Sequence, residues 1–131
     1  VMGIISILMS ISLFSIQGVR ESSRNSRRKS DLETIRQALE FYRADCNEYP
    51  PVDLPWGTAL TGTGAGVCSS ANTYLSKVPL DPNDPARKYY YQRLTAYSYM
   101  ICAALEDEGS AADAPGCGSC VETCTYKVTS R

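Results

Sequence analysis

The sequence contains no histidine, and no proline occurs before Pro50. Without histidine the chain lacks the usual general base and the commonest zinc ligand, which argues against an enzyme. The first 19 residues contain no charged side chain. Because no proline interrupts this part of the chain, we expect a single helix of about 45 residues, about 68 Å long at a rise of about 1.5 Å per residue.

The apolar run over residues 1–19 allows three interpretations. A secretory signal would have charge before the run and a small-residue cleavage site after it, and the sequence has neither pattern. A membrane span needs about 20 apolar residues, and this run falls just short. We therefore expect a membrane anchor, or a helix-packing surface, whose first residues are missing from this sequence. About eight residues are expected to precede Val1. A first residue that is not Met agrees with this expectation.

Residues 20–45 have the pattern of an amphipathic helix. Apolar side chains recur at Leu32, Ile35, Leu39 and Tyr42, a spacing that places them on one helix face. We expect these four residues to pack on a globular head formed by residues 46–131. The fold class predicted in this way is α+β, with a long N-terminal helix packed on a small antiparallel sheet.

The head is predicted to consist of a long loop, residues 46–75, and a sheet over residues 86–130. Proline and glycine are frequent in the loop. In TAYSYMICAAL the alternation predicts a strand with Tyr97, Tyr99 and Ile101 on one face and Ser98, Met100 and Cys102 on the other. We expect the last strand, CVETCTYKV, to return antiparallel beside it.

Six cysteines in so small a domain favour disulfides and an oxidising compartment. We expect Cys46 to pair with Cys68 and so close the loop. Cys102 with Cys124, and Cys117 with Cys120, are the preferred pairings for the remainder. The alternative is a zinc or redox site, since CGSC has the required C-x-x-C spacing and Cys102 and Cys124 could complete a four-thiolate zinc site.

Charge is distributed unevenly along the chain. Residues 20–31 carry a net charge of +3, and the remainder carries −4. A solvated helix face is the commoner reason for such a pattern, and contact between copies of one protein is another. Nucleic-acid binding is not expected, because no aromatic residue is interleaved with the arginines. The residues expected to form intersubunit charge pairs are Arg20, Arg24, Arg27, Arg28, Lys29, Asp31, Glu33 and Glu40.

Three segments resemble the type IV pilins and the major pseudopilins of type II secretion. The opening VMGIISILMSI is similar to the interior of their hydrophobic helix. DLETIRQALEFYRADCNEYPP is similar to the end of that helix, and YLSKVPLDPNDPARKYYYQ to the P-x-D-P segment before the sheet. Two features of the family, an N-methylated phenylalanine at the start and a glutamate shortly after it, are missing from this sequence.

The resemblance implies a filament subunit rather than an enzyme. Its implied partners are further copies of the same chain, a prepilin peptidase and an inner-membrane assembly machinery. It would lie in the cytoplasmic membrane before assembly and in an extracellular or cell-surface filament afterwards. We rank a surface pilus slightly ahead of a secretion pseudopilus. The residues expected in the filament core are Val1, Gly3, Ile4, Ile5, Ile7, Leu8, Ile11, Leu13, Phe14 and Gly18, and any extended segment of the helix is expected near Gly18.

No cofactor is expected, although major pseudopilins often bind calcium near the C-terminal sheet. The oxygen ligands that could serve here belong to Asp81, Asn83, Asp84, Glu106, Asp107 and Glu108. Neither cluster has the spacing of an EF-hand, so turns and a solvated loop are the preferred interpretation. Two other classes of function remain open: a membrane-anchored zinc or redox module, and a monomeric binding domain that the helix only tethers.

Overall fold

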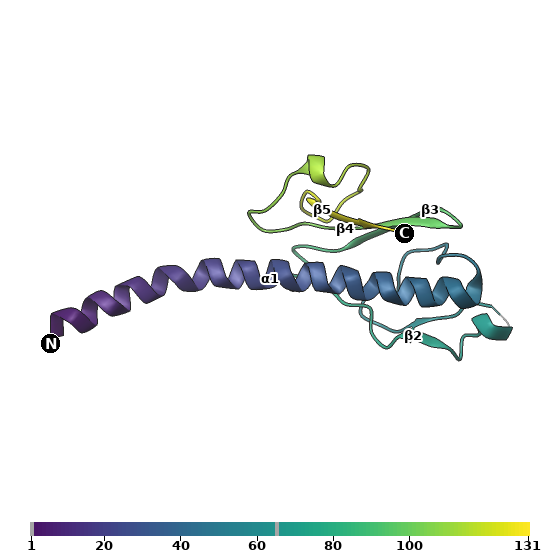
Figure 1. Ribbon diagram of the computed structural model, residues 1–131, viewed down its shortest axis with the longest axis horizontal. Helices are drawn as coiled ribbons and strands as arrows, with labels where there is room; N and C mark the ends of the chain where they lie inside the picture. The colour runs from purple at the N-terminus through teal and green to yellow at the C-terminus, as the bar shows by residue number, and fades with distance from the viewer. Residues whose placement is uncertain (1, 65) are drawn as a thin grey trace.

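A 45-residue helix, α1 (Met2–Cys46), dominates the architecture, as the sequence predicts (Figure 1). The computed structural model describes residues 2–64 and 66–131, without the side chains of residues 2 and 8–15. Val1 and the side chains of Leu8, Ile11, Leu13 and Phe14, all expected in the filament core, lie outside the described residues.

The helix ends where its last carbonyl groups are capped by a left-handed residue. Asn47 has a φ of 62°, and its N–H donates to the Arg43 carbonyl oxygen at 2.8 Å. Asparagine tolerates this conformation better than most residues, which makes it a suitable C-terminal cap. The prolines at positions 50 and 51 then keep the chain out of helical geometry.

Only the second half of α1 packs on the head. Leu32, Ile35, Leu39 and Tyr42, the predicted apolar stripe, are buried in one cluster with residues of the sheet and of the loop. Their partners in that cluster include Tyr49, Tyr91, Tyr99, Ile101 and Val128. Burial of this stripe is the main apolar contribution that holds the helix to the head.

The principal sheet is antiparallel and has the order β3-β4-β5. Its strands are β3 (Tyr90–Thr95), β4 (Ser98–Ala103) and β5 (Tyr126–Thr129). A second sheet pairs β1 (Leu60–Thr61) with β2 (Thr73–Leu75) on the other side of α1 (Figure 1). Two short 3-10 helices, η1 (Gly66–Cys68) and η2 (Ala111–Asp113), lie in the connecting loops. Tyr97, expected in a strand, lies instead in the turn between β3 and β4 and is exposed.

Both faces of β4 are covered, which the alternating pattern of its sequence does not reveal. Tyr99 and Ile101 face α1, whereas Met100 and Cys102 belong to a second buried cluster. That second cluster lies under the loop between β4 and β5 and includes Ala114. The cysteine-rich loop therefore acts as a cover for the outer face of the sheet.

Three disulfides tie these parts together. Cys46–Cys68 joins the end of α1 to η1, as predicted. The other two predicted pairings are wrong, because the structure has Cys102–Cys117 and Cys120–Cys124. The register explains the difference: the residue of β5 opposite Cys102 is Lys127, and β5 begins only at Tyr126, beyond Cys124.

Candidate functional site

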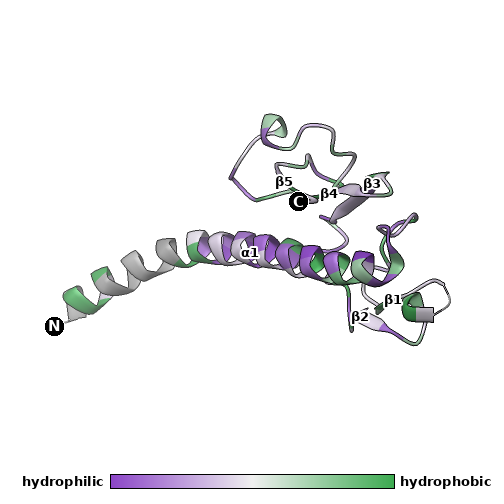
Figure 2. Cartoon of the chain, turned by 45° about the vertical axis from the view of Figure 1, so that its right-hand side comes forward, coloured by the Kyte–Doolittle hydropathy of each residue, from purple (hydrophilic) through white to green (hydrophobic). Residues whose placement is uncertain are grey.

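The first half of α1 extends beyond the head (Figure 1). Its described apolar side chains are exposed, among them Ile4 at 65% and Val19 at 64%. Figure 2 shows hydrophobic turns near the start of the helix and hydrophilic ones from about the basic stretch onward. A Cβ atom added at Gly3 or Gly18 would meet nothing within 4 Å. The described side chains of this half therefore present apolar surface that no other described part of the chain covers.

No helix among the described residues is both long and apolar enough to cross a membrane.

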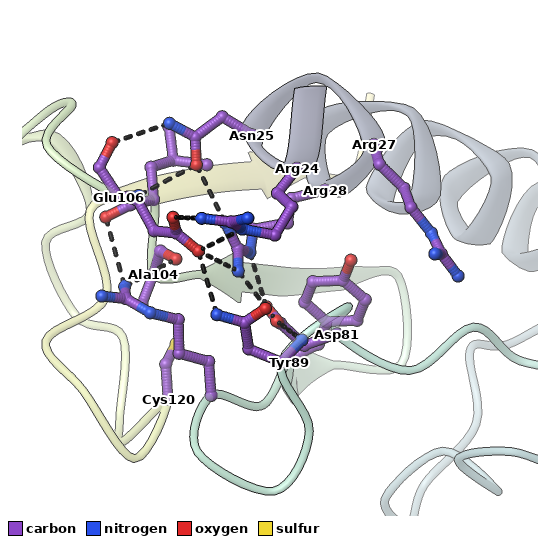
Figure 3. A network of polar contacts seen from close by, with 12 residues as sticks. Arg24, Asn25, Arg27, Arg28, Asp81, Tyr89, Ala104, Glu106 and Cys120 are labelled. Carbon is purple, nitrogen blue, oxygen red and sulfur yellow. Dashed lines mark hydrogen bonds and ion pairs between the residues drawn. The ribbon is translucent and has the colours of Figure 1, made fainter. Parts of the chain in front are cut away.

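A buried arginine joins the helix to the head at the point where the two separate. Arg28 has no exposed surface, and its Nε and Nη2 atoms donate to the two carboxylate oxygens of Asp81 at 2.7 and 3.0 Å (Figure 3). Nη2 also lies 3.0 Å from Oε1 of Glu106. A paired guanidinium with two hydrogen bonds to one carboxylate is among the more directional interactions that side chains form.

Glu106 is the second acceptor of this cluster. Its Oε1 atom accepts from Nε of Arg24 at 2.9 Å and from Nδ2 of Asn83 at 3.0 Å. The hydrogen bonds from Arg24, aided by those from Arg28, lower the pKa of Glu106 to about 2. Asn25 bonds the backbone of the same residue twice, donating to its carbonyl oxygen at 2.7 Å and accepting from its N–H at 2.9 Å.

We call Arg24, Asn25, Arg28, Asp81 and Glu106 the helix–head latch. Because a buried charge is costly without its partner, a rotation or shift of α1 that separated these groups would be strongly opposed. The apolar stripe alone would tolerate small sliding motions, since burial of apolar surface has no direction. The latch therefore defines the direction in which the apolar half of α1 leaves the head.

The latch changes the interpretation of the basic stretch. Arg28 was predicted to meet a neighbouring copy, and this is wrong, because its guanidinium is fully buried against its own chain. Arg24 and Lys29 also have partners within the chain, Glu106 and Glu108. Arg27 points away from the latch (Figure 3). Its Nε atom lies 3.9 Å from Oδ2 of Asp31, a long distance for an ion pair. Intersubunit contact remains a prediction for the exposed residues Arg20 and Arg27.

The acidic residues of the prediction also have partners in their own chain. Asp31 accepts a hydrogen bond from the Tyr89 hydroxyl at 2.7 Å, Glu40 accepts one from Tyr49 at 2.9 Å, and Glu33 pairs with Arg36 at 2.7 Å. Burial raises the pKa of Asp31, and the bond from Tyr89 partly opposes that rise. Each of these contacts supports the fold of one chain.

The latch brings together residues that the sequence presented as two separate calcium-ligand clusters. Asp81 and Glu106 both accept hydrogen bonds from Arg28, and the Asn83 amide bonds Glu106. Within the described part of the chain, no group of three or more acidic, cysteine or histidine side chains is arranged to hold a metal ion. The cation at the centre of these oxygens is the protein's own guanidinium.

One signal in the sequence could have revealed the latch. Arg28 lies four residues before Leu32 and so continues the apolar stripe of the helix. A cation on the buried face of an amphipathic helix requires a carboxylate partner in whatever covers that face. The acidic head offered such partners, but nothing local indicates which of them lie opposite.

Comparison with known families settles the affiliation of the chain. The model of the family described as type II secretion system (T2SS), protein G matches residues 15–114. The chain belongs to this family. Protein G of this system is the major pseudopilin, so the resemblance found in the sequence is confirmed. No curated protein and no solved structure matches the chain.

The match to the protein G family covers the latch, since Arg24, Arg28, Asp81 and Glu106 all lie within residues 15–114. It ends before Cys117, so the Cys120–Cys124 disulfide and one partner of the Cys102–Cys117 disulfide lie beyond it. The cysteine-rich cover of the outer sheet face is therefore completed by a part of the chain outside the matched region.

Proposed function

We propose that this pseudopilin-family chain is the structural subunit of a helical filament, which it builds by packing the first half of α1 against copies of itself. The observation that carries the proposal is the exposure of Ile4, Ile5, Ile7, Ile16 and Val19 on the part of α1 that extends beyond the head. Leaving apolar surface exposed to water, rather than buried, costs about 25 cal/mol of free energy per Å².

Two environments could cover this surface at different stages. In a bilayer, an isolated helix satisfies its own backbone hydrogen bonds and its side chains contact lipid. Once the chain leaves the bilayer, the same side chains must be buried against other apolar helices. Identical helices stacked side by side bury them in a shared core, with the heads outside. Such a contact joins two different surfaces of identical subunits. When it does not close into a ring, it produces a polymer.

The latch has a role in this assembly. Subunits in a helical polymer must repeat one geometry, and the angle between the helix and the head is part of that geometry. Arg28 and Asp81, both fully buried, hold that angle within each subunit. The apolar half can then pack with its copies while the heads meet neighbours in a constant orientation.

Of the two kinds of filament considered, the family match supports the secretion pseudopilus, although the sequence alone ranked a surface pilus slightly ahead. The alternative of a membrane-anchored zinc or redox module has little support. All six cysteines form disulfides and leave no thiolate to bind zinc or exchange electrons.

Electron microscopy of the purified full chain tests the proposal. After removal of detergent we expect helical polymers whose central density is formed by α1 and whose outer density is formed by the heads. Dispersed particles that stay in lipid or detergent under every condition of removal would favour the tethered monomer instead.

A further inference from the structure

A cleft of about 510 Å³ lies on the head where four segments meet. These segments are the loop after Pro50, the turn before β3, the start of β3 and the cysteine-rich loop. The buried side chains of Asp81 and Tyr89 line its inner part. Both are hydrogen-bonded to residues of α1: Asp81 accepts from Arg28, and Tyr89 donates to Asp31. The core of the fold therefore holds the cleft open, and a ligand would not have to create it.

One wall of the cleft is apolar and held in position. Trp56 is half-buried, and its ring centroid lies 6.1 Å from that of Tyr89. Its Nε1–H donates to Oδ1 of Asp53 at 3.1 Å, and the same oxygen accepts from the Leu54 N–H at 2.8 Å. The half-exposed side chain of Leu80 also lines the cleft. An indole fixed in this way offers a flat apolar surface at little cost in conformational entropy.

Three further lining groups are polar, and two of them carry charges of opposite sign. Asp84, Lys88 and Ser119 are exposed and line the cleft. Among the described residues, the Asp84 carboxylate and the Lys88 ammonium have no hydrogen-bond or ion-pair partner. The Ser119 hydroxyl oxygen accepts from the Val121 N–H at 3.2 Å, which leaves its own O–H free to donate.

This combination discriminates among ligand classes. A cation would be repelled by Lys88, and an anion by Asp53 and Asp84. A wholly apolar ligand would strip water from these charges without replacing its hydrogen bonds. A neutral molecule that has one apolar face, and both donors and acceptors around its edge, satisfies all of the lining groups. A pyranose ring has this character, since its C–H face can lie on an indole while its hydroxyl groups donate to carboxylates and accept from an ammonium group.

We propose that this cleft binds a neutral hexopyranose unit, of gluco, galacto or manno configuration, with Trp56 as the platform and Asp84 and Lys88 as the groups that orient the hydroxyls. The cleft is formed within a single chain, so this binding does not depend on the proposed filament. If the chain does polymerise, each subunit would present one such site.

Trp56 is the only tryptophan of the chain, so its fluorescence reports the cleft specifically. The full chain is kept in a detergent whose head group contains no sugar. It is then titrated with the methyl glycosides of glucose, galactose and mannose. Methylguanidinium and inorganic phosphate serve as the cationic and anionic probes. Saturation-transfer NMR of the same samples detects binding that leaves the fluorescence unchanged.

We expect a saturable response to at least one glycoside with a midpoint on the order of 1 mM, as suits a ligand of about a dozen non-hydrogen atoms in an open cleft. Asp84→Ala is expected to weaken binding about tenfold, the effect of one hydrogen bond to a charged group. Glu122→Ala, which removes an exposed carboxylate outside the cleft, is the matched control and is expected to leave binding unchanged. Thermal unfolding shows whether each variant is folded.

Three results would overturn the proposal. The first is the absence of both signals with all three glycosides. The second is a saturable response to methylguanidinium or phosphate in place of the sugars. The third is equal glycoside binding by the folded Asp84→Ala variant and the unaltered chain. None of these results depends on whether filaments form, so failure here is distinguishable from failure of the filament proposal.

Discussion

Nε of Arg28 lies 2.7 Å from Oδ2 of Asp81, and neither side chain has any exposed surface. The two residues are separated by 53 positions in the sequence and belong to α1 and to the turn before β3. Apolar burial brings the helix to the head, but this charged contact specifies one orientation of the helix relative to the sheet. If the chain assembles through α1, the contact also specifies how each head stands relative to the filament core.

Replacing Arg28 should destabilise the head strongly. Arg28→Ala leaves Asp81 and Glu106 without their shared cation, and we expect a loss of about 3 to 5 kcal/mol in the free energy of unfolding. Arg27→Ala is the matched control, since the Arg27 side chain is 63% exposed, and its effect should stay within about 0.5 kcal/mol. Urea unfolding of the full chain, followed by near-UV circular dichroism, measures both. Equal effects would show that the latch contributes nothing specific.

Acid should weaken the latch over a defined range of pH. In the folded chain the pKa of Glu106 is lowered from 4.5 to about 2, so its ionised form stabilises the fold fully above pH 4.5. That contribution is lost as the pH falls through the folded value of about 2. The raised pKa of Asp31 acts in the opposite sense, so the unaltered chain alone mixes the two effects.

The variant Glu106→Gln isolates the contribution of Glu106. We expect the difference in unfolding free energy between the unaltered chain and this variant to be largest above pH 4.5 and to shrink towards pH 2. A difference that stays constant from pH 5 to pH 2 would contradict an ionised Glu106 at the centre of the latch. Urea unfolding at a series of pH values provides the measurement.

The disulfides should differ in what they contribute. Cys46–Cys68 closes a loop with a sequence separation of 22, and Cys120–Cys124 one with a separation of only 4. Loop-closure entropy predicts losses of about 3 and about 2 kcal/mol in the free energy of unfolding when the first and the second pair are replaced by alanines.

The disulfide connectivity is a separate prediction. Peptide mapping of the oxidised chain should find Cys102 linked to Cys117. A link from Cys102 to Cys124 would contradict the register of β4 and β5.

The part of the fold that depends on local pattern is predictable from the sequence. The buried face of α1 follows from the helical spacing of Leu32, Ile35, Leu39 and Tyr42. The length of α1 follows from the absence of proline before Pro50. The pairing of Cys46 with Cys68 follows in the same way, since both flank one loop.

The other disulfides and the latch depend on contacts between distant segments. The partner of Cys102 is decided by the register that places Lys127 opposite it, and no local pattern encodes that register. The start of β5 at Tyr126 likewise reflects the disulfide between Cys120 and Cys124, which holds the preceding residues in a loop. Glu106, in a loop of acidic residues, acquires its role only because β4 ends beside Arg24 and Arg28.

A glycine substitution tests whether the helix must unwind on assembly. The sequence predicts that any extended segment lies near Gly18, and in the single chain α1 is continuous there. A Cβ atom at Gly18 or at Gly3 meets no neighbour within 4 Å, so Gly18→Ala and Gly3→Ala should each favour the helix by about 1 kcal/mol. If unwinding occurs at Gly18, only Gly18→Ala should slow polymerisation, as measured by light scattering. Equal rates for the two variants would argue against unwinding at this position.

The most direct test of the filament proposal places a charge in its core. Ile7 on α1 and Val52 on the head are similarly exposed in the single chain, at 62% and 69%. Ile7→Lys is expected to abolish filaments, because the lysine would be buried among apolar helices, whereas Val52→Lys should leave them intact. Membrane fractionation confirms that both variants reach the bilayer in equal amounts. Counting filaments by negative-stain electron microscopy then decides: filaments from Val52→Lys alone support the account, and equal numbers from Ile7→Lys would contradict it.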